Sequence, residues 1–261
     1  MDEHFKKRIM ELSEQSYTRD ILRYTDFLDM EEQALYHSMK RELGSERQLL
    51  FGGHEDADRN VLMFLPDYME EDYRLIKEGD LSRAEALSVV SMLELRPVNE
   101  RFSDELSHRD FLGALMNLGI ERKKTGDILT DGKKAYIFLM SDIADFVAKE
   151  LTKVKHTNVI CSIKPLSDCG IRPRLEELKV NAASERADAV AAAVFKLSRE
   201  TASKLVSGGL VYVSGRELSK ASYELKEGDR VSVRGYGKFI YHGVENTTKK
   251  GRLYLRISKY V

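Results

Sequence analysis

The chain of 261 residues is long enough for two or three compact domains, and with 42% hydrophobic and 33% charged residues it has a globular composition. Its apolar runs are far shorter than the roughly 20 residues that a membrane-spanning helix needs, so we expect no membrane segment, and we see no signal peptide. Cys161 and Cys169 fit neither a disulfide framework nor a common zinc spacing. We therefore expect a cytoplasmic protein without a metal site.

The charges are unevenly distributed along the chain. The formal net charge is −1, yet residues 181–261 hold 15 Lys and Arg against 8 Asp and Glu, while the remainder holds 27 against 35. This asymmetry predicts a polyanion-binding module joined to a body with another role. Taken alone, the charge is equally compatible with a solvated basic face.

The first 72 residues are expected to form an N-terminal α+β unit of helices and two strands. Apolar residues recur every three or four positions across residues 5–43, which predicts helices. Asp29 and Glu32 have the spacing of a capping box at the start of one of these helices. The two strands are predicted at residues 48–51 and 60–65.

Residues 73–166 predict a middle domain in which strands and helices alternate. A strand at 87–95 precedes a helix at 108–118, and a second helix opens at Ser141 or Asp142. The remaining strands are predicted at 127–129, 135–140 and 158–163. The order strand, helix, strand, strand, helix, strand is typical of the ferredoxin-like, RRM-like fold.

A linker is predicted at residues 167–180, followed by a C-terminal domain at 181–261. Its first helix, at 182–195, is rich in alanine, and Ser198 is a suitable N-cap for a second helix. Period-two alternation then predicts a small antiparallel sheet. Two strand faces of this sheet are basic, one with Arg230 and Arg234 and the other with Arg252, Tyr254 and Arg256.

Two stretches of the C-terminal domain resemble the S4 domain, which carries an αL RNA-binding motif. Residues 197–215 (LSRETASKLVSGGLVYVSG) are similar to its Ser-Arg helix, glycine stop and hairpin, and residues 225–233 (LKEGDRVSV) to its Gly-Asp turn and strand. The chain departs from the S4 pattern at Ala187, where leucine is usual, and at Ser214, where asparagine is usual.

Motifs along the whole chain are similar to the YlmH family of S4 proteins. They are FLD at 27–29, FGG at 51–53, FLPDY at 64–68, HRDFLGAL at 108–115, LGI at 118–120, GDI at 126–128 and RGYGKF at 234–239. The resemblance implies a ribosome-associated factor that acts in quality control on large subunits still carrying peptidyl-tRNA. It also implies a link to cell division.

The candidate RNA-binding residues are cations near helix starts and around the hairpin of the C-terminal domain. Arg186 and Arg199 are expected at the starts of two helices, where free N–H groups also favour phosphate oxygens. Because cations that neutralise phosphates release condensed counterions, such a surface suits RNA. The further members of this set are Lys204, Arg216, Lys220, Arg234 and Lys238.

A second RNA contact is a weaker hypothesis for the middle domain, and a solvated loop is its alternative. Its residues are Arg122, Lys123, Lys124, Lys133 and Lys134. An RRM-type sheet also stacks bases on aromatic residues, but Tyr136 and Phe138 are the only candidates here. The triplet His108-Arg109-Asp110 is similar to the catalytic triplet of protein kinases. The sequence has no kinase glycine-rich loop, Val-Ala-Ile-Lys or Asp-Phe-Gly motif beside it, so a helix cap is the favoured interpretation.

The function expected from these features is non-catalytic RNA binding on the large ribosomal subunit, with rRNA as partner and tRNA left open. We expect no cofactor and a monomer off the ribosome. One alternative is an RNA-modifying enzyme resembling pseudouridine synthases, although residues 1–180 show neither its Arg-Leu-Asp setting nor a methyltransferase glycine loop. The other is a division-linked protein whose acidic N-terminal body binds a protein partner.

Overall fold

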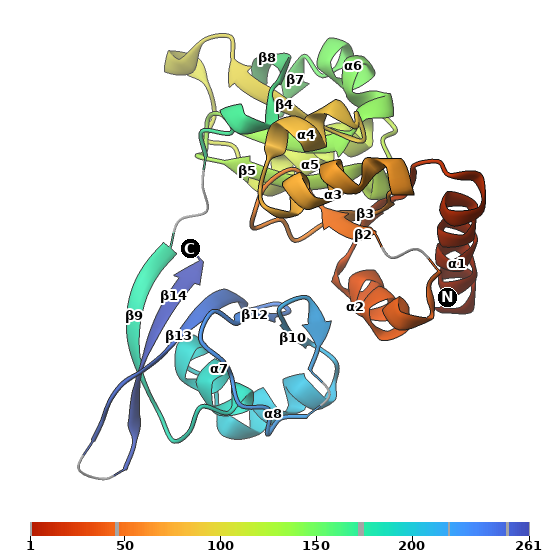
Figure 1. Ribbon diagram of the computed structural model, residues 1–261. Helices are drawn as coiled ribbons and strands as arrows, with labels where there is room; N and C mark the ends of the chain where they lie inside the picture. Colours follow the sequence, from red (N-terminus) through yellow and green to blue (C-terminus); the bar gives the residue numbers. More distant parts are fainter. Residues whose placement is uncertain (1, 45–46, 172–174, 219, 249–250, 261) are drawn as a thin grey trace. The chain divides into compact units, whose positions relative to one another are not determined.

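A computed structural model describes residues 2–44, 47–171, 175–218, 220–248 and 251–260 of the protein. The chain folds into two compact units, residues 1–172 and 173–261. Both units combine helices with sheets (Figure 1), so the α+β class predicted from the sequence is confirmed.

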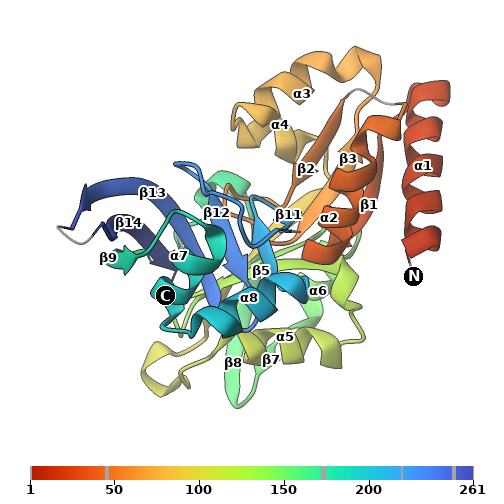
Figure 2. The same cartoon turned by 90° about the horizontal axis from the view of Figure 1, so that it is seen from below.

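The N-terminal part of the first unit is a three-stranded sheet with two helices on one face. Helices α1 (Asp2–Arg19) and α2 (Met30–Met39) flank β1 (Arg23–Leu28) in sequence, and β2 (Gln48–Phe51) and β3 (Asn60–Phe64) follow. The antiparallel sheet has the order β1-β3-β2. Ile9 of α1 and Tyr36 of α2 pack against Leu62 and Phe64 of β3, and Figure 2 shows both helices alongside β1 and β3.

Strand β1 corrects the prediction of continuous helices over residues 5–43. Tyr24, Thr25 and Phe27 favour a strand, and β3 provides a partner along its length. The Thr25 hydroxyl also accepts the backbone N–H of Leu62 at 3.0 Å. The capping box at Asp29 and Glu32 is present as predicted, and the strand pairing rather than local periodicity determines residues 23–28.

Two short helices link the three-stranded sheet to the middle domain, and neither was expected. They are α3 (Glu70–Lys77) and α4 (Leu81–Ala86). The boundary predicted between residues 72 and 73 falls inside α3. Ile76 and Ala84 of these helices join the same buried cluster as strands of both neighbouring sheets, so contacts pass across the predicted boundary.

The middle domain has the ferredoxin-like order of elements that the sequence predicts. Its sheet has the order β5-β6-β4-β8-β7, with antiparallel pairing throughout, and α5 and α6 pack on one face around Phe111 and Val147. The elements are β4 (Val90–Pro97), α5 (His108–Asn117), β5 (Thr125–Thr130), β6 (Ala135–Met140), α6 (Ser141–Glu150), β7 (Lys153–Val154) and β8 (Thr157–Lys164).

Short 3₁₀ turns occur throughout the first unit, at Lys40–Glu42, Asp67–Met69, Glu100–Phe102, Arg122–Lys124 and Leu166–Asp168.

The opposite face of this sheet is covered by the N-terminal sheet. Met92, Tyr136 and Phe138 lie in one buried cluster with Phe27 and Val61, and Phe138 is fully inaccessible to solvent. The His54 ring packs on Phe138 with 4.8 Å between ring centroids. Tyr136 and Phe138, the aromatic candidates for base stacking on an RRM-type sheet, are therefore closed off within this unit.

A polar contact fastens the loop between β2 and β3 to the middle domain. The Asp127 carboxylate of β5 accepts the backbone N–H groups of Asp58 at 2.7 Å and Arg59 at 3.2 Å, and it contacts His54 Nε2 at 3.1 Å. The Arg59 guanidinium donates to the carbonyls of Phe27 and Thr125 at 3.0 and 3.1 Å. These bonds satisfy polar groups at the junction that would otherwise be costly to bury.

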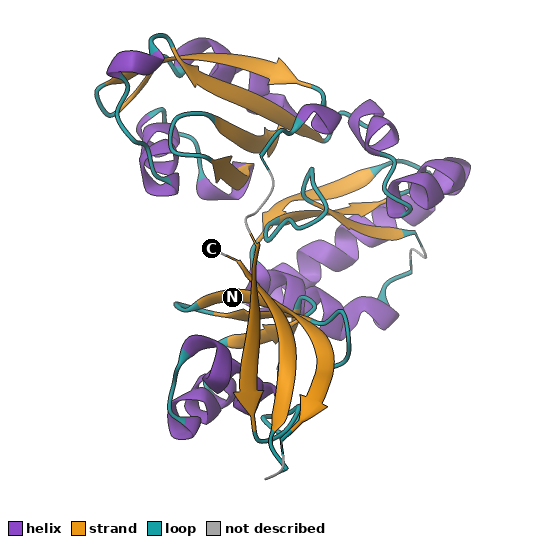
Figure 3. Ribbon diagram, turned by 90° about the vertical axis from the view of Figure 1, so that its left-hand side faces the viewer, coloured by secondary structure: helices purple, strands orange, loops and turns teal. Residues whose placement is uncertain are grey.

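The second unit is one six-stranded antiparallel sheet with two helices. Its order is β11-β10-β12-β13-β14-β9, and the helices gather on one side of the long strands (Figure 3). Val190 and Val206 of the helices pack against Val231, Phe239 and Leu255 of the sheet. The elements are β9 (Leu175–Ala182), α7 (Ala187–Phe195), α8 (Arg199–Ser207), β10 (Val211–Val213), β11 (Arg216–Glu217), β12 (Arg230–Val233), β13 (Gly237–Thr247) and β14 (Leu253–Tyr260).

Strand β9 corrects the linker predicted at residues 167–180. Residues 172–174 lie outside the described residues, but from Leu175 onward the chain pairs with β14 in continuous register as far as Ala182. Leu178 and Val180 pack against the core of the second unit. The sheet of this unit therefore begins before the predicted start at residue 181.

Candidate nucleic-acid interface

The start of α8 presents a cation that is free to meet an anion. Ser198 caps the helix, and its hydroxyl accepts the backbone N–H of Thr201 at 3.0 Å. Ala202 and Val206 are the buried residues of this helix. Arg199 follows the cap, is exposed, and has no hydrogen bond or ion pair with any residue that the structure describes. A guanidinium beside free helix N–H groups is suited to a phosphate oxygen.

Lys204 lies on the same helix and is loosely held. Its ammonium group is 2.7 Å from Glu200, but both side chains are about three-quarters exposed. An exposed pair of this kind contributes at most about 1 kcal/mol, because water and salt screen it. Lys204 therefore remains available to a polyanion.

Arg186 is placed at the N-cap of α7 as expected, but it is largely engaged. Its Nε and Nη2 atoms donate to the two carboxylate oxygens of Asp188 at 3.0 and 2.8 Å, and the Asp188 side chain is buried. The hydrogen bonds and charge of Asp188 raise the Arg186 pKa. With 34% of the side chain exposed, the Nη1 atom is the part left for an RNA contact.

The hairpin between β10 and β11 adds two exposed cations. Ser214 and Gly215 have φ values of +50° and +77°, which is the type I′ geometry of a two-residue hairpin and explains why asparagine suits position 214. Arg216 follows the turn and is exposed, as is Lys220. The charge of Arg216 acts on Tyr223, whose carbonyl accepts the N–H of Ala187 at the start of α7.

Arg234 and Lys238 lie around the turn between β12 and β13, at the end of these strands that is away from the Ser214 turn. Arg234 is exposed in the turn after β12, and its backbone N–H donates to Leu210. Lys238 lies over the Tyr260 ring, 4.9 Å from its centroid. The sequence-predicted set in this unit therefore divides into cations near α8 and the hairpin, and cations on the sheet.

The five basic residues predicted as a second contact do not form one cluster. Arg122–Lys124 precede β5, whereas Lys133 and Lys134 lie in the turn that follows it, so the strand separates them. Lys124 is paired with Asp26 and Asp142, and Lys134 with Glu94. Lys123 contacts Glu121, and Lys133 donates to the Glu100 carbonyl.

Arg122 is also withdrawn from the surface. Its Nη1 donates to the carbonyls of Thr125 and Gly126. Burial, together with the nearby charge of Arg59, lowers its pKa to about 10. Internal bonds thus engage Arg122, Lys124 and Lys134 of the predicted second contact, whereas Lys123 and Lys133 stay exposed.

A groove on the helix side of the middle domain contains cations that the sequence analysis did not assign to RNA. It has a volume of about 520 Å³ and runs between α5 and β7. Arg109 and Lys153 line it and have no partner among the described residues, whereas Lys155 is bound to Asp110 at 2.9 Å. Hydrogen bonds from the Ser107 N–H and from Lys155 lower the Asp110 pKa to about 2. The sequence did not predict this groove, because the hairpin with Lys153 and Lys155 lies some 40 residues after α5 and no spacing rule relates the two segments.

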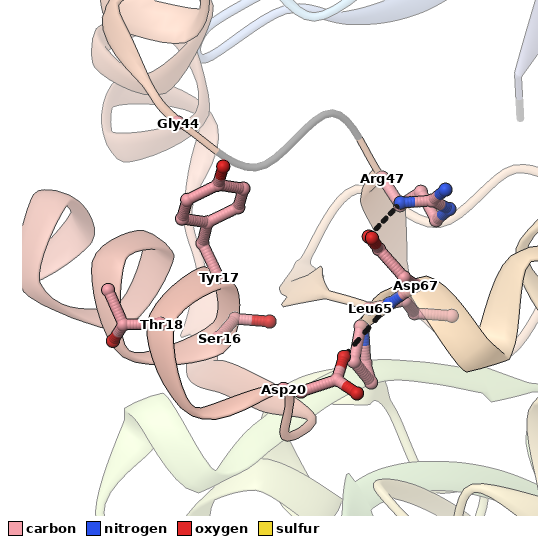
Figure 4. A pocket seen from close by; sticks show the side chains of 9 residues that line it. Ser16, Tyr17, Thr18, Asp20, Gly44, Arg47, Leu65 and Asp67 are labelled. Carbon is pink, nitrogen blue, oxygen red and sulfur yellow. Dashed lines mark hydrogen bonds and ion pairs between the residues drawn. The ribbon is translucent and has the colours of Figure 1, made fainter.

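A larger hollow of about 970 Å³ lies in the N-terminal part (Figure 4). Arg47 is the cation in its lining, and it is paired with Asp67 at 2.6 Å and Glu70 at 3.3 Å. Asp20 accepts the Asp67 N–H at 3.2 Å. Among the residues that the structure describes, the charged groups of this hollow already have partners.

Neither a cluster of metal ligands nor a membrane-spanning helix is present among the described residues. No group of three or more His, Cys, Asp or Glu side chains there could hold a metal ion. Within the same residues, no helix has both the length and the apolar character needed to cross a bilayer.

Comparison with known families defines the class of this protein. Residues 185–231 match the S4 domain, and residues 90–168 match the putative RNA-binding domain in YlmH. The second match spans β4 to the turn after β8, which is the ferredoxin-like domain. The protein is thus an S4-domain protein with a second domain of a putative RNA-binding type.

A relative of known role narrows the class to one family. The chain is 32% identical over 236 residues to the ribosome-associated protein quality control protein P2 of Bacillus subtilis (strain 168), covering 88% of this chain and 84% of the relative. The chain belongs to the YlmH family. A solved structure, the cell division protein ylmH from Streptococcus pneumoniae, is 22% identical with a TM-score of 0.46, over 64% of this chain and 93% of that one.

Proposed function

We propose that this protein is a non-catalytic RNA-binding factor that binds the large ribosomal subunit through its S4 domain and acts in ribosome-associated quality control. The rRNA of that subunit, and peptidyl-tRNA held on it, are the RNA partners in this proposal. The protein acts in the cytoplasm and is a monomer off the ribosome. The name and role of the Bacillus relative support the setting.

The observation that carries the proposal is the free cation at the start of α8. Arg199 lies within the residues that match the S4 domain, beside helix N–H groups, and Lys204 is five residues further along the same helix. A rigid surface of helix and hairpin recognises the backbone and shape of folded RNA more readily than base sequence. Binding through such a surface should weaken as salt rises, because it depends on counterion release.

The test is co-sedimentation of the full chain with purified large ribosomal subunits at several KCl concentrations. The double substitution Arg199→Glu and Lys204→Glu should lower the affinity at least tenfold and reduce the slope of log affinity against log salt by about 1.5. The matched control reverses Lys6 and Arg8, two exposed cations of α1, and should bind as the wild type does. Equal binding by both double variants would contradict the S4 domain as the anchor.

A further inference from the structure

The six-stranded sheet of the second unit has a face that its own helices leave open. Leu255 and Ile257 of β14 point into the core with α7 and α8, so the alternate residues of that strand point to the other side. Tyr254 and Arg256 are among them, with 39% of the Tyr254 residue and 57% of the Arg256 side chain exposed. From the sequence, only the basic face of one strand, with Arg252, Tyr254 and Arg256, was predicted here.

Tyr254 lies at the centre of a group of polar side chains. Along the chain, Arg252 and Arg256 are two residues away on either side and share its face. Across the sheet, its register partners are Asn181 of β9 and Asn246 of β13. Directly opposed residues of an antiparallel sheet have Cβ atoms about 5 Å apart. An aromatic ring is thus bordered by two amides and two guanidinium groups.

The ring itself is available. The Tyr254 side chain has no ring contact or hydrogen bond with any residue that the structure describes, whereas the Tyr260 ring on the same strand is already covered by Lys238. Arg252 donates through Nε to the Asn181 side-chain oxygen and through Nη2 to the Asn181 carbonyl at 3.2 Å. This arrangement holds the Asn181 amide and leaves its NH₂ group for a ligand.

The charge of the face suits a polyanion. Lys179, Arg252 and Arg256 surround the ring, and Lys179 is opposite Arg256 in the register. The acids nearby are Glu245, which is bound to Lys179 at 2.7 Å, Glu227, which approaches Arg256 only to 3.8 Å, and the exposed Glu177 beside Lys179.

A hollow of about 300 Å³ continues from Arg256 and Lys179. His242, Ser258 and Glu177 also line it. The His242 Nε2 and the Ser258 hydroxyl are hydrogen-bonded at 2.7 Å.

We propose that this open face is a second RNA site, in which an unstacked base of single-stranded RNA lies on the Tyr254 ring. Base stacking on an exposed aromatic residue within a basic groove is the general mode of single-strand binding. Asn181 and Asn246 are placed to donate to the edges of that base, and Arg252 and Arg256 to the flanking phosphates. The site is separate from the α8 surface, because α8 packs on the other face of the sheet. It deepens the proposed function by naming the RNA class.

The experiment measures binding of a fluorescent ten-nucleotide single-stranded RNA to the full chain. Tyr254→Ile keeps a strand-favouring side chain but removes the ring, and should weaken binding roughly tenfold or more. Tyr254→Phe keeps the ring and should bind within about twofold of the wild type. The matched control is Tyr68→Ala, since Tyr68 is 68% exposed in the first unit, and it should have no effect.

The outcomes separate this inference from the proposed function. Wild-type affinity of Tyr254→Ile would overturn the stacking site, and so would a Tyr254→Phe variant as weak as Tyr254→Ile. The Arg199→Glu, Lys204→Glu variant should still bind the short RNA even where it loses the ribosomal subunit. Conversely, Tyr254→Ile should still bind a ten-base-pair RNA duplex with unchanged affinity, because a duplex offers no unstacked base.

Discussion

Gly53 lies where the loop between β2 and β3 crosses the side chain of Phe138 on β6. A Cβ atom at this position would be 2.3 Å from Phe138 Cδ1, and the φ of Gly53 is +95°. Phe138 is fully buried and cannot move aside. The glycine thus meets a conformational and a steric requirement, and its contact comes from a residue 85 positions later, so the sequence pattern alone could not reveal it.

We expect Gly53→Ala to lower the free energy of unfolding by about 3 kcal/mol, because backbone strain and overpacking act together. Gly79→Ala is the matched control, since Gly79 has φ of +98° but open space around its Cβ position. It should lose only about 1 kcal/mol from strain. Urea denaturation of the full chain measures both, and equal losses would show that Phe138 yields without cost.

The strands show most clearly what local sequence could and could not predict. The ferredoxin-like elements and the cap at Ser198 follow from local signals and were predicted correctly, and the resemblance to the S4 domain predicted the hairpin at Ser214. The segment at 23–28 was predicted as helix because its apolar spacing suits both structures, and β3 decides between them. Strand β9 was missed although Leu178, Val180 and Ala182 alternate, because its partner β14 lies more than 70 residues later.

At the candidate site, residue type was easier to predict than availability. The Arg199 side chain is exposed and has no ion pair among the described residues. Arg186, Arg122 and Lys124 are bound to partners that only the folded structure shows. The open face around Tyr254 was seen as one basic strand, and only the pairing with β9 and β13 places Asn181 and Asn246 beside the ring.

Glu94 in the central strand β4 links stability to pH. It is buried, which favours the neutral acid, but hydrogen bonds from Lys134, Arg96 and Tyr136 outweigh burial and lower its pKa to about 2. Because the folded pKa is below the unfolded value, the stabilisation is complete above about pH 4.5 and is lost as pH falls toward 2.

We therefore expect Glu94→Gln to lower the free energy of unfolding by about 2 kcal/mol at pH 7. The difference from the wild type should shrink between pH 4.5 and pH 2. Denaturation at a series of pH values measures this, with Glu105→Gln, an exposed carboxylate outside any ion pair of the described residues, as the control. A difference that stays constant down to pH 2 would contradict the role of these hydrogen bonds.

At the scale of the first unit, the N-terminal sheet and the middle domain form one structure. They share the buried cluster around Phe27 and Phe138, and Asp127 fastens the loop of residues 52–59 across the junction. The boundary predicted between residues 72 and 73 did not anticipate this contact, because no local signal marks a face that another sheet will cover.

Asp127→Asn should loosen this junction. One side-chain oxygen that accepts backbone N–H groups is replaced by a donor, which should cost about 2 kcal/mol and speed hydrogen exchange across residues 52–59. Asp131→Asn is the matched control, because Asp131 accepts two N–H groups within its own turn, from Lys133 and Lys134. Unchanged exchange in residues 52–59 of the Asp127 variant would rule out the fastening role.

The covered sheet face also affects how this family's second domain can be handled in the laboratory. A fragment cut to residues 90–168, the span of the family match, would expose Met92, Tyr136, Phe138 and Met140 to water as a contiguous apolar patch. Such a patch promotes self-association. An expression fragment that stays soluble should instead start at the N-terminus and extend through residue 171, so that the sheet keeps its cover.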